Sequence, residues 1–224
     1  MIKSLEAGEW GPGDAIPSEA ELAVRFNVSQ GTVRKAIDEM AAENLLVRRQ
    51  GKGTFVATHS DPRSFFRFLR LMPDSGQLAH YHSEPLSFCT GAATAEAAAA
   101  LNIQVGDPVV LIERVLCFEE KPVVFDEICL VGELFAGLTF ERLKSYERSL
   151  YSLFETGFGV RMIRAEERLR AIPANPRAAD LLATKVGSPL LLVERVAFTY
   201  GNKPVEWRRG YYCTEQHYYL NELG

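Results

Sequence analysis

The chain has 224 residues, of which 47% are hydrophobic and 24% charged, and its formal net charge is −4. This is the composition of an ordinary globular protein, with enough apolar material for one large or two small domains. No apolar run approaches the ~18 residues of a membrane helix, and the first ten residues do not resemble a signal peptide. We therefore expect a cytoplasmic protein, in which the distribution of charge says more about partners than the net charge does.

Residue types typical of metal, redox or catalytic sites are sparse. The four cysteines lie far apart without C-x-x-C spacing, and His80 and His82 have no third candidate ligand nearby in the sequence. We expect buried free thiols, no metal site and no cofactor. Since no nucleophile motif, phosphate-binding loop or pair of catalytic acids is evident, the sequence predicts no catalytic residues and no enzyme.

Two short helices are predicted in close succession near the N-terminus. The first begins at Ser18 and Glu21, which have the spacing of a capping box, and it ends at Asn27. The second begins after Ser29, another favourable N-cap residue. Their buried faces are set by apolar residues at helical spacing: Leu22, Ala23 and Phe26, then Val33, Ile37 and Met40. Two capped helices joined by a tight turn are typical of a helix-turn-helix, whose second helix reads DNA bases.

A glycine-rich hairpin follows the two helices. Residues 46–49 and 54–57 are predicted strands, and the turn between them, residues 50–53, contains glycines that permit positive φ angles. Such a hairpin is a wing. Its basic residues Arg49 and Lys52 are suited to contact phosphates or the minor groove.

Basic residues concentrate in this part of an acidic chain. Thr32, Arg34 and Lys35 fall off the apolar stripe of the second helix, so we expect them to face outward. A small helical domain with an ordinary solvated basic face is the alternative interpretation. The ordered series of two capped helices and a basic hairpin favours a winged helix-turn-helix that binds DNA.

The same segment resembles the winged helix of the GntR family of bacterial regulators. The motifs are P-S-E-A-E-L-A at 17–23, V-S-Q-G-T-V-R-K-A-I at 28–37 and R-Q-G-K-G-T-F-V at 49–56. The resemblance implies DNA contacts from the first turn of the second helix and from the wing. With the exposed cations added, the predicted DNA-binding residues are Ser18, Ser29, Gln30, Gly31, Thr32, Arg34, Lys35, Arg49, Gln50, Gly51 and Lys52.

Three features depart from the family pattern. Ala20 and Gln30 stand where many members carry a basic residue, so the base preference is expected to differ. A glutamine at position 30 suits adenine, whereas arginine favours guanine. Only residues 2–7 correspond to the first helix of the family, which is usually longer, and a truncated or misassigned start would explain this.

Residues 59–77 are predicted to form a linker followed by a docking segment, between domains at 1–58 and 78–224. Turn signals lie at both ends, in Asp61-Pro62 and Pro73-Asp74-Ser75-Gly76. The stretch between them contains three phenylalanines: Phe65, Phe66 and Phe68. They are either part of the core of the next domain or the seam through which the two domains communicate.

The second domain contains an internal repeat. Residues 105–115, V-G-D-P-V-V-L-I-E-R-V, match residues 186–196, V-G-S-P-L-L-L-V-E-R-V. Each copy is followed by Lys-Pro-Val, at 121–123 and at 203–205. Self-similarity of this kind indicates one structural unit used twice.

The elements before each copy are also alike. An Ala-rich helix is predicted at 94–101 and at 176–182, and a strand-like run precedes each helix, at 86–93 and at 168–174. The repeated strand-helix-strand-turn-strand unit predicts an α+β domain with a mostly antiparallel, internally duplicated sheet. The seam between the two halves is suited to bind a ligand.

This arrangement resembles the UTRA effector domain of the HutC-type branch of the GntR family, which shares its fold with chorismate lyase. The resemblance covers residues 86–220, and its further signposts are S-L-Y at 149–151 and K-P-V-E-W at 203–207. It implies a chorismate lyase-like fold that binds a small-molecule effector.

The resemblance also implies effector-binding residues. Arg114 matches a strand arginine that faces the pocket, and Glu127 matches an acidic residue on the next strand. Ser149 opens the S-L-Y helix, where its hydroxyl and the backbone amides suit an anion. The remaining candidates are Tyr151, Glu206, Tyr218 and Tyr219.

Arg114 also has a purely structural interpretation. It would then pair with Glu127 or Glu113 and only hold the sheet together. Because Arg195 occupies the equivalent position of the second copy, we expect at least one of the two arginines to be structural. Members that take sugar phosphates usually carry a second arginine where Leu116 stands, so a small carboxylate fits this pocket as well as a sugar phosphate.

The combined features predict a homodimeric repressor that binds a palindromic DNA operator and is released by a small anionic metabolite, either a carboxylate or a sugar phosphate. An activator requires only that the effector prefer the opposite state, so the sign of regulation stays open. The alternatives are a chorismate lyase-like enzyme and a ligand-independent DNA-binding protein.

Overall fold

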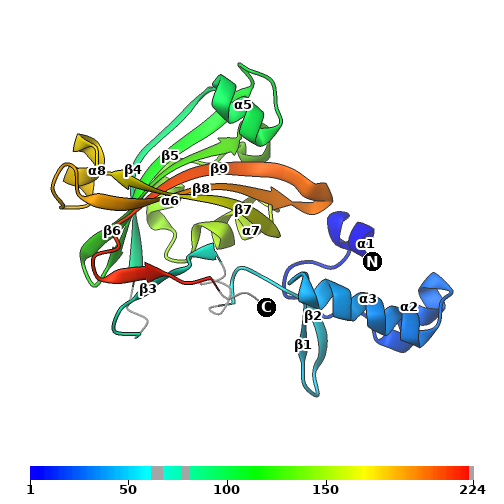
Figure 1. Cartoon of the computed structure of the whole chain (residues 1–224). Helices are drawn as coiled ribbons and strands as arrows, with labels where there is room; N and C mark the ends of the chain where they lie inside the picture. Colours follow the sequence, from blue (N-terminus) through cyan, green and yellow to red (C-terminus); the bar gives the residue numbers. More distant parts are fainter. Residues whose placement is uncertain (62–67, 77–80, 222–224) are drawn as a thin grey trace. The chain divides into compact units, whose positions relative to one another are not determined.

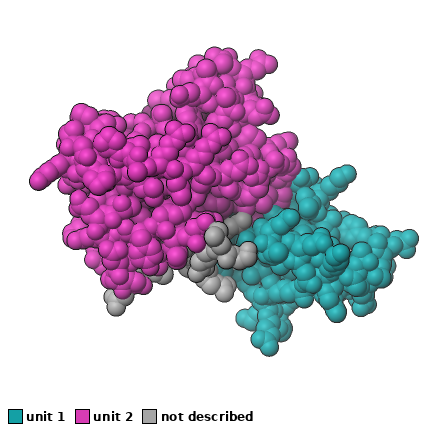
Figure 2. Space-filling view, viewed as in Figure 1, with its two compact units in different colours: residues 1–64 teal, residues 65–224 magenta. Residues whose placement is uncertain are grey.

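The structure, a computed structural model, describes residues 1–61, 68–76 and 81–221. The chain divides into two compact units, residues 1–64 and residues 65–224 (Figures 1 and 2). The predicted linker and docking segment, 59–77, has residues in both units. Phe65 and Phe66 of that segment lie outside the described residues.

Unit 1 begins with three helices, α1 (Ile2–Glu6), α2 (Glu19–Phe26) and α3 (Gln30–Ala42). The predicted capping box at Ser18 and Glu21 is confirmed, and Ser29 caps α3 by accepting a hydrogen bond from the Thr32 amide. Asn27 ends α2 in the left-handed conformation, with φ of 52°, which asparagine adopts more readily than most residues. These local signals fix where both helices start and stop.

A two-stranded hairpin completes unit 1. Strands β1 (Leu46–Arg49) and β2 (Gly53–Val56) pair antiparallel, and the turn is closed by the Lys52 amide, which donates to the Arg49 carbonyl at 2.9 Å. Gly51 and Gly53 have positive φ angles, as expected from the sequence. The second strand starts one residue earlier than predicted because Gly53 pairs with Arg49.

Unit 2 is built around one six-stranded sheet with the order β4-β5-β6-β9-β8-β7, in which every neighbouring pair is antiparallel. Its strands are β4 (Tyr81–Ala92), β5 (Pro108–Phe118), β6 (Lys121–Val131), β7 (Arg164–Pro173), β8 (Pro189–Thr199) and β9 (Lys203–Tyr212). A separate pair joins β3 (Leu71–Pro73) to β10 (His217–Tyr219). The helical elements are α5 (Ala95–Leu101), η2 (Gly132–Phe135), α6 (Phe140–Ser145), α7 (Leu150–Phe158), α8 (Pro176–Leu181) and η3 (Tyr200–Asn202).

The predicted duplication is confirmed. Each half consists of a strand, a short helix and a β-hairpin, and the strand order of the second half mirrors that of the first. The turns that precede β5 and β8 also match. The Ala93 amide donates to the Asp107 carbonyl at 2.8 Å, and the Ala174 amide donates to the Ser188 carbonyl at 2.7 Å. The α+β fold class follows from the duplicated sheet and its helices.

Helices cover both faces of the sheet (Figure 1). On one face, α6, α7 and η2 pack on Ile112, Ile128 and Leu130. On the other face, α5 packs on Val109 and Cys129, and α8 packs on Val115 and Phe125. Because side chains alternate between the faces of a strand, each residue of the sheet is assigned to one face by its position along the strand. We call these the α7 face and the α5/α8 face.

The exposure of the cysteines and the length of the helices bear on two expectations from the sequence, buried free thiols and the lack of a membrane helix. Cys117 and Cys129 are buried free thiols, as predicted, whereas the prediction of burial is wrong for Cys89, which is exposed on the edge strand β4. None of the helices in the described residues has the length and hydrophobicity to span a membrane.

Candidate functional site

The start of α3 presents the residues expected to read DNA. Gln30, Gly31, Thr32, Arg34 and Lys35 are all exposed, because Val33 and Ile37 point into the core of unit 1. Among the predicted residues, the two serines have structural tasks. Ser29 and Ser18 are exposed, but their hydroxyls cap α3 and α2. An exposed helix start with polar side chains is the geometry by which a recognition helix contacts base edges.

Arg34 is tied to α2 by an ion pair. Its Nε and Nη2 atoms donate to Oε2 of Glu19 at 3.0 and 2.8 Å, and its side chain is still 62% exposed. Arg48 of β1 approaches the same carboxylate at 3.7 Å and also pairs with Asp38 at 2.7 Å. The hydrogen bond from Arg34 lowers the pKa of Glu19. Glu19 therefore holds Arg34 extended across the surface beside the start of α3.

The wing tip carries the other predicted DNA-binding residues. Arg49, Gln50, Gly51 and Lys52 are exposed, and the Arg49 guanidinium lies 4.7 Å from the centre of the Phe55 ring. Stacking on an aromatic ring orients a guanidinium without neutralising it. The wing can thus present positive charge to a phosphate backbone.

A network of charged side chains, five of them buried and one partly buried, crosses the α7 face of the sheet. Its six members, which we call the charge cluster, come from the five strands β5 to β9: Arg114, Asp126, Glu167, Arg195, Glu206 and Arg208. Directly opposed residues of antiparallel strands point to the same face, and the register places Arg114 opposite Asp126 and Arg195 opposite Arg208. Three arginines thus meet three carboxylates, all of them buried except Glu167, whose side chain is 15% exposed.

Asp126 lies at the centre of the first half of the cluster. Nε and Nη2 of Arg114 donate to its Oδ2 atom at 2.9 and 2.8 Å, and Nη1 of Arg208 donates to the same oxygen at 3.1 Å. Its Oδ1 atom is buried without a hydrogen-bond partner among the described residues. Burial alone would raise the pKa of Asp126, but the charges of Arg208 and Arg114 outweigh it and hold that pKa below its usual range.

Glu206 links the cluster to helix α7. Arg208 donates to both of its carboxylate oxygens, at 3.0 and 2.9 Å, and the Tyr151 hydroxyl donates to Oε1 at 2.8 Å. Burial, and then the nearby Glu206 charge, raise the pKa of Tyr151, so its hydroxyl stays a proton donor. Two predicted effector residues, Tyr151 and Glu206, are therefore in direct contact, and Arg208 and Asp126 connect them to Arg114.

The second half of the cluster is built on Arg195. Its Nε donates to Oε1 of Glu167 at 2.6 Å, and its Nη2 donates to the Phe68 carbonyl. The Tyr219 hydroxyl donates to the other oxygen of Glu167. Burial followed by the hydrogen bond to Glu167 raises the pKa of Tyr219. Tyr219 thus joins the cluster through Glu167, at the end opposite Arg114.

Three predicted effector residues lie elsewhere. Glu127 points to the α5/α8 face, where it accepts a hydrogen bond from Tyr211 at 2.8 Å and pairs with Arg209 at 3.3 Å. The idea that Glu127 or Glu113 pairs with Arg114 is therefore wrong, because neighbouring residues of a strand face opposite sides and Asp126 takes that place. Ser149 caps α7, and Tyr218 is 42% exposed on β10.

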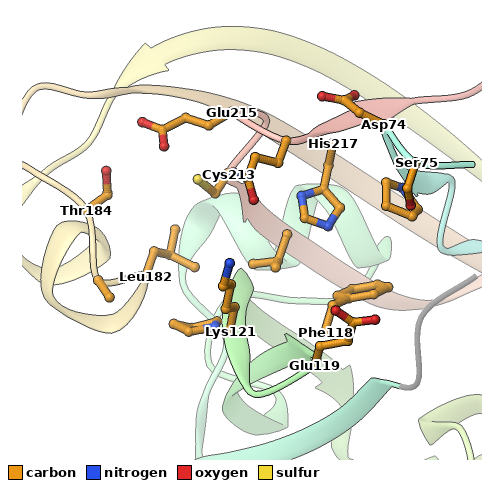
Figure 3. A pocket seen from close by; sticks show the side chains of 15 residues that line it. Asp74, Ser75, Phe118, Glu119, Lys121, Leu182, Thr184, Cys213, Glu215 and His217 are labelled. Carbon is orange, nitrogen blue, oxygen red and sulfur yellow. The ribbon is translucent and has the colours of Figure 1, made fainter. Parts of the chain in front are cut away.

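Two surface grooves lie outside the charge cluster. One, of about 450 Å³, lies on the α5/α8 face and is lined by Glu127, Arg209 and Trp207 among others. The other, of about 770 Å³, is shown in Figure 3, where His217 lies near the middle, between Lys121 and Phe118. Burial lowers the pKa of His217. The charged side chains that line this groove are Asp74, Glu119, Glu215 and Lys121, and none of the predicted effector residues lines it.

Comparison with protein families accounts for both units. Residues 2–56 match the model of the gntR family of bacterial regulatory proteins, and residues 76–218 match the UTRA domain. The UTRA match covers more than half of the chain, and the two matches occur in the order predicted from the sequence.

The chain is a GntR-family transcriptional regulator with a UTRA domain. The relatives of this GntR–UTRA protein are regulators rather than enzymes. It is 29% identical to the histidine utilization repressor of Pseudomonas putida, over 92% of this chain and 81% of that one. It is 32% identical to an HTH-type transcriptional regulator of Mycobacterium tuberculosis, over 87% of this chain and 72% of that one. The predicted resemblance to the HutC-type branch is thereby confirmed.

Solved structures of the family resemble the GntR–UTRA chain. The ligand-binding domain of a GntR-family regulator from Bordetella bronchiseptica is 45% identical, covers 70% of this chain and 98% of its own, and superposes with a TM-score of 0.67. PhnF from Mycobacterium smegmatis covers the whole of this chain and 98% of its own with a TM-score of 0.60, at 24% identity. The fold of both units is therefore one that this family adopts.

Sequence reasoning missed four members of the charge cluster as site residues: Asp126, Glu167, Arg195 and Arg208. A signal for Asp126 was present, because it alternates with the apolar Val124, Ile128 and Leu130 along β6 and so shares their buried face. Arg195 was singled out by the repeat, although only as a structural equivalent of Arg114. The remaining pairings join distant strands and have no local signal.

Proposed function

We propose that this regulator is a repressor that binds a palindromic operator as a homodimer and is released by a small metabolite bound at the charge cluster. The observation that carries the proposal is the convergence of Arg114, Tyr151 and Glu206 on one buried network in a UTRA domain that follows a winged helix. Buried charges that are costly to maintain are common where a ligand must be recognised.

The metabolite is proposed to bind in the part of the charge cluster around Arg114. Its Nη1 atom is the least engaged nitrogen, 3.5 Å from the Ser83 hydroxyl, and its other two nitrogens already bind Asp126. A carboxylate or phosphate oxygen of the metabolite would bind between Nη1 and Ser83. The vacant Oδ1 of Asp126 would accept a hydrogen bond from a hydroxyl or amine of the same metabolite.

Regulation requires that the metabolite favour one state of the dimer. Two recognition helices fit successive major grooves only at a spacing of about 34 Å, one turn of DNA. One state of the dimer has this spacing and the other does not. If the metabolite binds the second state about 10–100-fold more tightly than the first, the coupling free energy between metabolite and DNA is about 1.4–2.7 kcal/mol. The similar histidine utilization repressor is by its name a repressor, which supports repression rather than activation by the present chain.

The DNA-binding half of the proposal is tested by selecting duplexes from a random-sequence library with the wild-type chain and measuring affinity by mobility shift. We expect a palindromic consensus. Arg34→Ala should weaken binding about tenfold or more, because it removes a cation at the start of the recognition helix. Arg168→Ala removes another exposed cation, on β7, and should bind like the wild type. Failure to select any duplex, or unchanged affinity of Arg34→Ala, would refute this assignment.

A further inference from the structure

We propose that Phe68 relays the state of the charge cluster to the segment that leads to the DNA-binding unit, and that Arg195 is the positioning residue that holds Phe68 in place. This inference rests on the proposed function, in which a ligand at the cluster controls operator binding. It gives the two equivalent arginines of the duplicated sheet different tasks.

The main chain of Phe68 is held by Arg195. The guanidinium donates to the Phe68 carbonyl through Nη2 and to Glu167 through Nε, and its side chain is only 3% exposed. Glu167 is in turn bound by the Tyr219 hydroxyl. A planar guanidinium shared between a carboxylate and a carbonyl fixes the direction of both bonds. The position of Phe68 therefore depends on the second half of the cluster.

The ring of Phe68 is held by Tyr151, which binds Glu206 of the charge cluster. It packs edge-on against Tyr151, with ring centres 5.0 Å apart and an interplanar angle of 81°. Tyr151 donates to Glu206 at 2.8 Å, so any ligand that moves Glu206 also moves the surface on which the Phe68 ring rests. Phe68 is thus buried between two anchors that belong to one charged network.

The residues after Phe68 are fixed to the domain. Leu69 and Leu71 are buried against Val193 and Tyr212, and the Leu220 amide donates to the Arg70 carbonyl at 2.8 Å. The chain before Phe68 leads to unit 1, which ends at residue 64. Phe68 is therefore the first residue of the described segment 68–76, whose following residues are packed on unit 2, and a displacement of Phe68 acts on the chain that precedes it.

Among the described residues, the equivalent arginine of the first half makes no hydrogen bond to a main-chain carbonyl. The internal repeat makes Arg114 equivalent to Arg195, yet the hydrogen bonds of Arg114 go to the side chains of Asp126 and Ser83. An ordinary core phenylalanine needs only apolar contact, whereas the carbonyl of Phe68 is also bound by a buried cation, Arg195 of β8. This difference points to a relay rather than to packing alone.

The test uses the full chain and three variants. Arg195→Lys keeps the charge but loses the planar fork, and Phe68→Leu keeps an apolar side chain but loses the ring. Phe135→Leu is the matched control, because Phe135 is buried in the same core and contacts Phe154 and Phe158 rather than the cluster. Operator affinity is measured without ligand on the selected duplex by fluorescence anisotropy, and hydrogen exchange is measured for residues 68–73.

We expect Arg195→Lys to speed hydrogen exchange in residues 68–73 about tenfold, because the segment is held less firmly. Arg195→Lys and Phe68→Leu should each change operator affinity about tenfold without ligand, while Phe135→Leu stays within about twofold of the wild type. Operator affinities of both variants within about twofold of the wild type would overturn the relay even if the duplex is bound normally. A wild-type chain that selects no duplex would refute the proposed function, and this inference with it.

Discussion

The two halves of the duplicated sheet share their order of elements and differ in their buried contacts. Arg114 and Arg195 occupy equivalent positions on β5 and β8, after turns with the same hydrogen bonds. Arg114 is paired with Asp126 on the inner strand β6, whereas Arg195 is paired with Glu167 on the edge strand β7. The repeat therefore determines where a cation is buried, and the neighbouring strand determines what it binds.

The centre of the sheet shows a second difference between the halves. Counting from the Lys-Pro-Val of each half, Asp126 corresponds to Arg208, and Glu127 corresponds to Arg209. Each of these equivalent pairs forms an ion pair, at 3.1 Å on the α7 face and 3.3 Å on the α5/α8 face. If the two halves were identical, each of these pairs would consist of two like charges. Opposite charges at equivalent positions instead make the two halves complementary.

The largest expected effect is that of Asp126→Asn. It leaves Arg114 and Arg208 buried without their shared carboxylate, and removing one partner of a buried ion pair costs about 3 kcal/mol of unfolding free energy. Urea unfolding followed by Trp207 fluorescence, in a Trp10→Phe background, measures the loss in unit 2. Glu127→Gln makes the equivalent change on the opposite face, where the side chain is 32% exposed, and should cost less than about 1 kcal/mol. Equal effects of the two substitutions would contradict the central role of Asp126.

In the second half of the sheet, Glu167→Gln should cost less, about 1.5 kcal/mol, because the amide oxygen can still accept from Arg195 while the amide NH2 donates to the Tyr219 hydroxyl oxygen. The same urea experiment measures it. Glu166→Gln, in which a 66% exposed carboxylate pairs with Arg164, serves as the control and should leave stability within about 0.5 kcal/mol. A loss as large as that of Asp126→Asn would mean that the two halves are equally dependent on their carboxylates.

Arg114→Lys separates ligand response from fold. The lysine keeps a positive charge near Asp126 but has a single nitrogen, so no second nitrogen remains for the metabolite, and the ligand-induced release from DNA should weaken about tenfold, or about 1.4 kcal/mol. Operator affinity without ligand should be unchanged. Arg209→Lys makes the same substitution on the α5/α8 face and should respond like the wild type. A normal response of Arg114→Lys would leave this arginine with a structural task only.

The smallest expected effect is a loss of stability at alkaline pH, confined to unit 2. All eight tyrosines lie after residue 64, and burial raises the pKa of Tyr212 to about 12. A raised pKa means that the folded state holds the proton more tightly, so stability is complete below pH ~10 and is lost as the pH rises through the folded value. At pH 10 this tyrosine lowers the free energy of unfolding by about 0.4 kcal/mol, because half of the phenol is ionised in the unfolded state.

Fluorescence of Trp10 and Trp207, one in each unit, distinguishes the two responses to alkali. Raising the pH from 8 to 11 should lower the urea midpoint of unit 2 and leave that of unit 1 unchanged. Tyr212→Phe should reduce the pH dependence of unit 2. An equal decline in both units would show that the buried tyrosines are not its cause.

Sequence patterns predicted the features that depend on near neighbours in the chain. The capping box at Ser18, the left-handed end of α2 at Asn27 and the wing glycines each depend on contacts within a few residues. The repeat predicted the order of strands and helices in unit 2, because each copy carries the same turn signal.

The charge cluster could be predicted only in part. The resemblance identified two members, Arg114 and Glu206, and Tyr151, which binds Glu206. Whether Asp126 or Glu127 is the partner of Arg114 depends on which face of β6 each residue occupies. The contact of Arg195 with Phe68 joins residues 127 positions apart, so no local pattern announces it. Contacts of this kind are fixed by the register of the folded sheet rather than by spacing in the chain.

The most direct test of the account is to measure whether a small anionic metabolite changes operator affinity. Wild-type protein is bound to its selected duplex, and glucose 6-phosphate, fructose 6-phosphate, succinate and citrate are each added while fluorescence anisotropy is followed. We predict that a compound of one of these two classes weakens operator binding about tenfold or more and also raises the melting temperature of unit 2. A compound that stabilises unit 2 without altering operator affinity, or operator binding that is indifferent to every compound of both classes, would contradict the claim that the charge cluster controls DNA binding.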